Sequence, residues 1–149
     1  MEGLEIVVFK LEEQSFGVDI SQVKEILKGG QIEALSDLPS FLDGIVKFKE
    51  EYLPVIDLEK RLGAEVSPKR ETSILVIDIN GRDIGVQVTS IQGVGNLGLD
   101  GIRPIPRLIL KNLKVDYIWG IGKLEKDLIF LLDLNRVLKK EEIAQLVNP

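Results

Sequence analysis

Two aspartates occupy matching places in the chain, and they are the residues best suited to chemistry. Asp57 and Asp133 each follow an apolar run and precede a short helical pattern. A pair of acids in related positions is one way to build acid–base catalysis. An aspartate before a helix is also a common N-cap, because its carboxylate accepts hydrogen bonds from the free N–H groups of the first turn. We expect the capping role for both residues.

The composition removes the side chains on which most enzymes depend. The 149 residues include no His and no Cys. Histidine is the commonest general base near neutral pH and the commonest transition-metal ligand, and cysteine is needed for thiolate nucleophiles and disulfides. Carboxylate chemistry would need acids clustered around a pocket, and the sequence shows no such cluster. The chain is therefore predicted not to be an enzyme and to have no cofactor or metal site.

The charge balance is acidic, with 24 Asp+Glu against 19 Lys+Arg and a net charge of −5. This balance argues against nonspecific nucleic-acid binding, which needs a basic face. The acidic start, Met1 to Glu5, is unlike a signal peptide, and no apolar run approaches the roughly 18 residues of a spanning helix. We expect a cytoplasmic protein without membrane insertion, folded as a single domain over residues 1–149.

An internal duplication is the strongest feature of the chain. Residues 44–62 align without a gap with residues 120–138, at an offset of 76 (120 − 44). Residues 6–26 align with residues 74–94 at an offset of 68 (74 − 6). The repeat units therefore cover about 6–62 and 74–138, and the second contains extra residues between its two aligned parts.

The repeats predict an all-β fold made of two five-stranded β-barrels related by the duplication, with short helices and a C-terminal helix. Isoleucine and valine are abundant, and Asn80-Gly81 between apolar runs is typical of a tight hairpin turn. Each half of the chain is expected to form one barrel from four strands of its own, with a fifth strand from the connections or from the other half. The proline-containing stretch from Gly95 to Trp119 suits an extended loop or edge segment.

Two local patterns resemble ligand sites. The run from Gly93 to Gly98 matches GxGxxG, but the glycine and prolines that follow would interrupt the helix that a dinucleotide site needs, so a glycine-rich exit from a strand is the better interpretation. Lys47 and Lys49 alternate with Phe48 and Tyr52, which leaves open a small barrel that binds a small ligand or single-stranded nucleic acid. Neighbouring glutamates favour a mixed-charge solvated face instead.

Apolar residues beyond what two small barrels need are found after the first strand pair of each repeat: Val18, Ile20, Val23, Ile26 and Leu27, with Val86, Val88, Ile91 and Val94. Large exposed apolar patches often mark partner sites. These residues are expected either between the barrels or on such a patch.

The chain resembles the CheW family of chemotaxis coupling proteins over nearly its whole length. The similarity is carried by strings in the family's order and spacing, among them residues 6–11 (IVVFKL), 16–20 (FGVDI), 23–26 (VKEI), 53–58 (LPVIDL), 102–106 (IRPIP) and 131–134 (LLDL). The resemblance implies a non-enzymatic scaffold that links the regulatory domain of the chemotaxis histidine kinase to the cytoplasmic tips of methyl-accepting chemoreceptors. A divergent member that serves another signalling system is the alternative within the family.

The resemblance also implies which residues meet partners. Val23 and Glu25 match a partner-contact segment, Lys49 takes the place of a usual arginine beside Lys47, and Val94 matches a receptor-contact position. Three departures stand out. Residues 47–50 (KFKE) replace the family's Asn-Leu-Arg-Gly turn, Thr89 replaces an acid, and Gly93 replaces a second acid.

Overall fold

The computed structural model describes residues 3–11, 13–29, 31–63, 72–112 and 116–147, and strands predominate among them. The strands are β1 (Gly3–Leu11), β2 (Gln14–Asp19), β3 (Glu25–Lys28), β4 (Gly44–Phe48), β5 (Glu51–Asp57), β6 (Thr72–Ile79), β7 (Arg82–Thr89), β8 (Ile91–Gly98), β9 (Ile102–Arg103), β10 (Ile118–Leu124) and β11 (Asp127–Leu132). The helices are α1 (Leu58–Arg61), α2 (Arg107–Asn112) and α3 (Lys140–Val147), with 3-10 turns η1 (Ile20–Gln22), η2 (Leu99–Gly101) and η3 (Leu134–Arg136).

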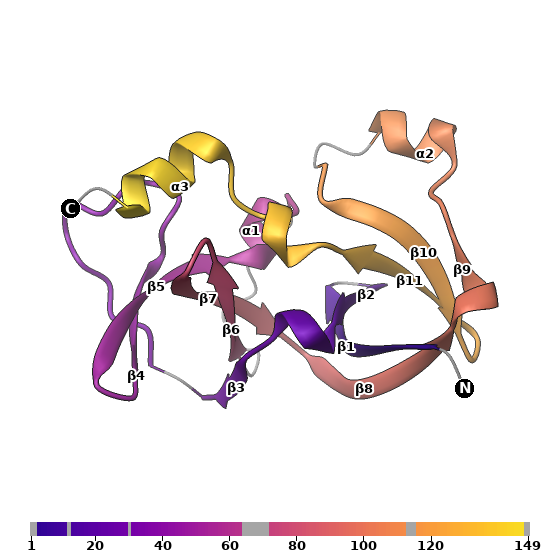
Figure 1. The fold of residues 1–149 in the computed structure, drawn as a ribbon, viewed down its shortest axis with the longest axis horizontal. Coiled ribbons are helices and arrows are strands. Elements are labelled where there is room, and N and C mark those ends of the chain that lie inside the picture. Colours follow the sequence, from indigo (N-terminus) through magenta and orange to yellow (C-terminus); the bar gives the residue numbers. More distant parts are fainter. Residues whose placement is uncertain (1–2, 12, 30, 64–71, 113–115, 148–149) are drawn as a thin grey trace.

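The strands form two curled sheets, which we call lobe 1 and lobe 2. Lobe 1 has the strand order β8-β1-β2-β11-β10-β9, and lobe 2 has the order β3-β6-β7-β5-β4. The two lobes lie side by side, with the chain termini at opposite ends of the molecule (Figure 1). The predicted all-β fold with two β subdomains is confirmed. Lobe 1 has one strand more than expected, because the two-residue strand β9 pairs with β10.

The prediction that each half of the chain makes its own barrel is wrong. Lobe 1 joins the first hairpin, β1–β2, to the last, β10–β11, whereas lobe 2 joins β4–β5 to β6–β7. Figure 1 shows the indigo strands β1 and β2 in the same lobe as the orange and yellow strands β10 and β11. The exchange rests on two parallel pairings, β2 with β11 and β5 with β7. Each repeat therefore contributes a hairpin to both lobes.

A glycine lies at each of these parallel pairings, and the two glycines are equivalent in the duplication. Gly17 pairs with Leu131 and Gly85 pairs with Val55. A Cβ atom at Gly17 would come within 2.8 Å of Ile6 Cδ1, and one at Gly85 would come within 2.8 Å of Ile74 Cγ2. A larger residue at either position would therefore force the packed isoleucine side chain to shift.

The largest apolar core lies between the lobes. It includes Phe9, Val18, Leu58, Val86 and Val88, while smaller clusters around Ile6 and around Val55 fill lobe 1 and lobe 2. The sequence left open whether the surplus apolar residues lie between the barrels or on an exposed patch. Most of the surplus apolar residues belong to this boundary core or pack on it, namely Val18, Ile20, Val23, Ile26, Val86, Val88 and Ile91. Leu27 packs in lobe 2, and Val94 is exposed.

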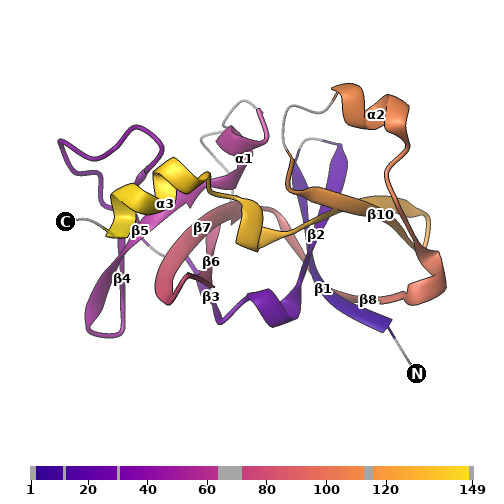
Figure 2. The ribbon, with the colours of Figure 1, turned by 45° about the horizontal axis from the view of Figure 1, so that its top comes forward.

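The helices and turns follow their local sequence signals. Asp57 caps α1 and Asp133 caps η3, since the Oδ1 atom of each accepts a backbone N–H hydrogen bond from the first turn. Asn80 and Gly81 have φ of 52° and 83°, as the predicted tight hairpin requires. The C-terminal helix α3 begins after lobe 1 is complete and crosses over lobe 2, beside α1 and β5 (Figure 2).

The stretch from Gly95 to Trp119 is more structured than its prolines suggested. It contains the end of β8, the turn η2, the edge strand β9 and, after Pro106, the helix α2. The predicted edge segment is thus found at β9, but α2 was not anticipated. The GxGxxG run lies inside strand β8 and opens no helix, so it is not a dinucleotide motif. The run was expected to leave a strand, but its residues instead pair with β1 as part of β8.

Candidate partner-binding surfaces

Lys47 and Lys49 lie on the β4–β5 hairpin of lobe 2. Lys47 is exposed on β4 and pairs with Tyr52, and Lys49 is exposed in the turn with φ 57°. The ammonium of Lys49 lies 5.2 Å from the centre of the Phe48 ring. Phe48 itself packs against the lobe 2 core. Since that ring is not free to stack on a base, the arrangement weakens the interpretation as a nucleic-acid groove.

Val23 and Glu25 lie on either side of the entry to the edge strand β3. Val23 ends η1 and packs partly buried against the boundary core, whereas Glu25 is exposed and starts β3. Between them, Lys24 forms an ion pair of 2.6 Å with Asp83 of β7. This pair fixes the β3 entry against the β6–β7 hairpin and leaves the Glu25 side chain facing solvent.

A groove of about 530 Å³ lies between the two edge strands of lobe 2. Its walls include Leu27 from β3, Val46 and Lys47 from β4, and Tyr52 from β5. Tyr52 is 58% exposed, a large fraction for an aromatic side chain. Because β3 and β4 border the groove from opposite sides, it connects the Glu25 strand to the Lys47–Lys49 hairpin. We call this region the β3–β4 surface.

Val94 lies apart from these residues, on the edge strand β8 of lobe 1. Its side chain is 55% exposed, although it pairs with the buried Val7 of β1. A hollow of about 580 Å³ adjoins it at the lobe boundary, lined by Lys28 of β3, Thr72 of β6 and Gly93 of β8, among others. The five predicted contact residues therefore fall on two surfaces: four on lobe 2 around β3 and β4, and Val94 on lobe 1.

Two of the family departures have local structural causes. Thr89 is buried and its hydroxyl donates a hydrogen bond to the buried carboxyl group of Glu59, so an acid at position 89 would face a second acid. Gly93 has φ 134°, at a register irregularity between β1 and β8. A side chain there would be strained. A buried hydrogen bond thus accounts for Thr89, and the backbone conformation accounts for Gly93.

Lobe 1 also exposes apolar side chains that the sequence analysis did not single out. Trp119 on β10 is 44% exposed, Leu128 on β11 is 56% exposed and Leu108 on α2 is 76% exposed. The alternation of buried and exposed residues along β10 would have placed Trp119 outward. No sequence signal located Leu108, because α2 itself was not predicted.

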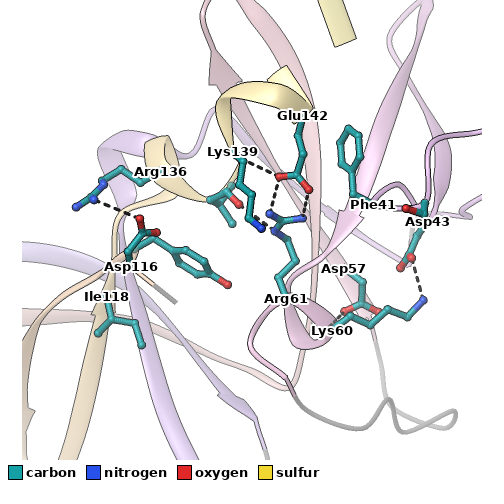
Figure 3. Close-up of a pocket in the computed structure, with 13 residues that line it drawn as sticks. Phe41, Asp43, Asp57, Lys60, Arg61, Asp116, Ile118, Arg136, Lys139 and Glu142 are labelled. Carbon is teal, nitrogen blue, oxygen red and sulfur yellow. Dashed lines mark hydrogen bonds and ion pairs between the residues drawn. The ribbon is translucent and has the colours of Figure 1, made fainter. Parts of the chain in front are cut away.

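The third hollow is a cleft between the lobes of about 860 Å³, which we call the inter-lobe cleft. Arg61 of α1 crosses it to Glu142 of α3 in a two-pronged ion pair with N–O distances of 2.7 and 3.1 Å (Figure 3). Burial acts to raise the pKa of Glu142, but the hydrogen bonds from Arg61 and from the Lys139 backbone outweigh it and lower that pKa below 4.5. Glu142 is therefore a carboxylate at neutral pH.

The acids near the cleft have structural partners. Asp57 is buried, which raises its pKa, and its Oδ1 atom accepts N–H hydrogen bonds from Glu59 and Lys60 at 2.9 and 3.3 Å. Asp43 pairs with Lys60 at 2.9 Å (Figure 3). Among the described residues, no group of His, Cys, Asp or Glu has a metal-binding arrangement.

The surfaces and the fold together define a two-lobed β scaffold in which both matched aspartates serve as helix caps. The comparisons then supply the family: residues 5–142 match the model of the CheW-like domain, and the chain belongs to that family. The resemblance seen in the sequence is thereby confirmed.

Individual CheW proteins are similar to this chain over nearly its whole length. The chemotaxis protein CheW of Klebsiella aerogenes is 29% identical over 147 residues, covering 98% of this chain and 88% of that protein. The chemotaxis protein CheW of Bacillus subtilis is 29% identical over 140 residues, covering 93% and 89%. The crystal structure of the scaffolding protein TtCheW from Thermoanaerobacter tengcongensis superposes with a TM-score of 0.81, at 29% identity over 93% of this chain and 94% of that one.

Proposed function

We propose that this chain is a chemotaxis scaffold that binds a histidine kinase and a chemoreceptor at the same time and performs no catalysis itself. The observation that carries the proposal is the family membership over residues 5–142, joined to a fold whose matched acids are committed to capping helices. The related protein of known structure is described as a scaffolding protein, and several relatives as chemotaxis proteins.

We assign the kinase to the β3–β4 surface of lobe 2. A regulatory domain built of similar barrels would dock a barrel against this end of lobe 2. The surface offers an aromatic side chain, Tyr52, flanked by the exposed charges of Glu25, Lys47 and Lys49. An apolar centre with a charged rim is the usual composition of a specific protein interface.

We assign the receptor tip to Val94 and the neighbouring hollow at the lobe boundary. The hollow is lined by residues of both lobes, so a receptor helix lying there would contact lobe 1 and lobe 2 together. Separate surfaces allow both partners to bind together, and modest affinities at each are enough when the partners belong to one assembly.

The proposed partners place the protein in the cytoplasm, where the kinase and the receptor tips meet. Among the described residues, no helix combines the length and the apolar character that a membrane span requires. A small-ligand barrel is the remaining alternative from another class. For single-stranded nucleic acid, Phe48 is partly buried, which leaves Tyr52 as the exposed aromatic on the β4–β5 hairpin.

The test of the proposal is co-elution with the regulatory domain of a chemotaxis kinase from the same organism on a sizing column. A complex at tens of micromolar, about the strength of a transient interface, is the expected result. Failure to co-elute with every such kinase domain of that organism would contradict the kinase assignment. Salt-dependent binding to an oligonucleotide in the same assay would favour the nucleic-acid alternative.

A further inference from the structure

The inter-lobe cleft lies where equivalent positions of the two repeats face each other. Phe41 and Tyr117 both line it, as do Lys60 and Arg136, and each pair is related by the offset of 76 found in the sequence. Arg61 and Val137 form a third such pair. The two repeats therefore supply different side chains to the same cleft from positions that share one sequence offset.

The difference between Phe41 and Tyr117 is a hydroxyl group that the fold does not use. Tyr117 is only 4% exposed, and among the described residues its oxygen is the one buried side-chain polar atom without a hydrogen-bond partner. Phe41, which stands 76 residues earlier and also lines the cleft, has no hydroxyl. A buried unpaired hydroxyl costs stability. The Tyr117 hydroxyl is therefore a hydrogen-bonding group that no described residue of the folded chain uses.

The hydroxyl lies in the electrostatic environment of the cleft. Burial raises the pKa of Tyr117 to about 12, and the charges that act on it belong to the cleft residues Arg61, Asp116 and Glu142. The group is therefore a protonated hydrogen-bond donor at neutral pH.

The cleft contains hydrogen-bond donors without a close partner among the described residues: the Tyr117 hydroxyl and the Lys139 ammonium. Three of its four acids have close partners: Asp43 pairs with Lys60, Asp57 caps a helix, and Glu142 pairs with Arg61. The Lys139 ammonium makes no ion pair within 4.0 Å with a described residue, although its charge helps lower the pKa of Glu142. Arg136 is held only loosely, 3.7 Å from Asp116, and both side chains are mostly exposed (Figure 3).

We propose that the inter-lobe cleft binds a small organic anion whose carboxylate or phosphate oxygens accept hydrogen bonds from the Tyr117 hydroxyl and the Lys139 ammonium. A volume of about 860 Å³ suits a small molecule. Because the Tyr117 oxygen is buried, the ligand must displace neighbouring side chains to reach it. This site is separate from the β3–β4 surface and from Val94. A negative result here would therefore leave the proposed scaffold function unaffected.

The test uses citrate and pyrophosphate as probes, added to the full chain at constant ionic strength and followed by amide chemical shifts. We expect saturable shifts near Tyr117 and Lys139 with at least one probe, and the identity of that probe separates carboxylate from phosphate recognition. Tyr117→Phe and Lys139→Gln should each weaken binding about tenfold or more, the weight of one hydrogen bond to a charged group. Lys123→Gln, an exposed lysine on β10 outside the cleft, should bind as the parent chain does.

Thermal unfolding of Tyr117→Phe provides a second readout. Without ligand, this variant should unfold at the same temperature as the parent chain or higher, because it loses only an unpaired hydroxyl. The proposal is overturned if neither probe produces saturable shifts, or if both cleft variants bind as well as Lys123→Gln. Lower thermal stability of Tyr117→Phe without ligand would also overturn it, because the hydroxyl would then have a structural partner.

Discussion

Arg61 and Glu142 join two helices that follow strands of different lobes. Arg61 ends α1, which follows β5 of lobe 2, while Glu142 belongs to α3, which follows the last strand of lobe 1. Besides the two contacts to Glu142, Arg61 Nε donates to the Val137 carbonyl at 2.9 Å. Ile143 and Leu146 of α3 pack on the boundary core beneath this pair. The ion pair therefore anchors α3, which follows the last strand of lobe 1, against α1 on lobe 2 (Figure 2).

Removing one partner of this anchor should destabilise the fold. Both side chains are only 15% exposed, so Arg61→Ala leaves a largely buried carboxylate without its cation. We expect a loss of about 2–4 kcal/mol in the free energy of unfolding, measured with urea. The control is Lys60→Ala, whose ion pair with Asp43 is mostly exposed on the lysine side and should contribute at most about 1 kcal/mol. Equal losses in the two variants would contradict the anchoring role.

The same pair makes a predictable contribution to acid stability. The pKa of Glu142 is lowered in the folded state, so its contribution is fully present above the unfolded-state value and is lost as the pH falls through the folded value. Between about pH 6 and pH 3, Glu142→Gln should therefore lose less stability than the parent chain does. Urea unfolding across this range measures the difference. Parallel curves for the two proteins would show that the carboxylate is not stabilised in the fold.

Alanine substitution of Gly17 or of Gly85 should lower the free energy of unfolding to a similar extent. Gly17→Ala and Gly85→Ala each push a methyl group against an isoleucine side chain, and each should cost about 1–3 kcal/mol of unfolding free energy. Gly101→Ala is the matched control, because a Cβ atom there meets nothing within 4 Å and its φ is not in the left-handed region. A neutral Gly17→Ala would contradict the close approach of β2 to Ile6.

The buried hydrogen bond between Thr89 and Glu59 gives a further prediction. Thr89→Val keeps the shape of the side chain but leaves the Glu59 carboxyl group without its partner, at a cost of about 1–3 kcal/mol. Adding Glu59→Leu should recover part of that loss, because the unpaired buried group is then gone. The double-mutant cycle in urea measures the coupling. Additive losses would show that the two residues act independently.

The sequence predicted the fold class through the duplication, because matched apolar patterns and turns report local structure directly. It did not predict that the repeats exchange hairpins, since the parallel pairing of Gly17 with Leu131 joins residues far apart in the chain and leaves no local signal. For the same reason the ion pair from Arg61 to Glu142 was not foreseen. The matched aspartates were predicted as caps and are caps, because capping depends only on the next few residues.

The predicted contact residues were located by resemblance, and their roles remain predictions. Lys49 lies in the left-handed region, so Lys49→Ala removes the charged side chain without relieving the backbone. Val94→Asp places a charge on an exposed position of β8 without opening the core. These two variants address the two proposed surfaces separately.

The most direct test of the account is whether the two partners bind together. A kinase regulatory domain is titrated into this protein with and without a saturating receptor-tip fragment, and the affinity for the kinase domain is measured by calorimetry. We predict a ternary complex, with Lys49→Ala weakening only the kinase interaction and Val94→Asp only the receptor interaction. Displacement of the kinase domain by the receptor fragment, or equal weakening of both interactions by either variant, would contradict simultaneous occupancy of two surfaces.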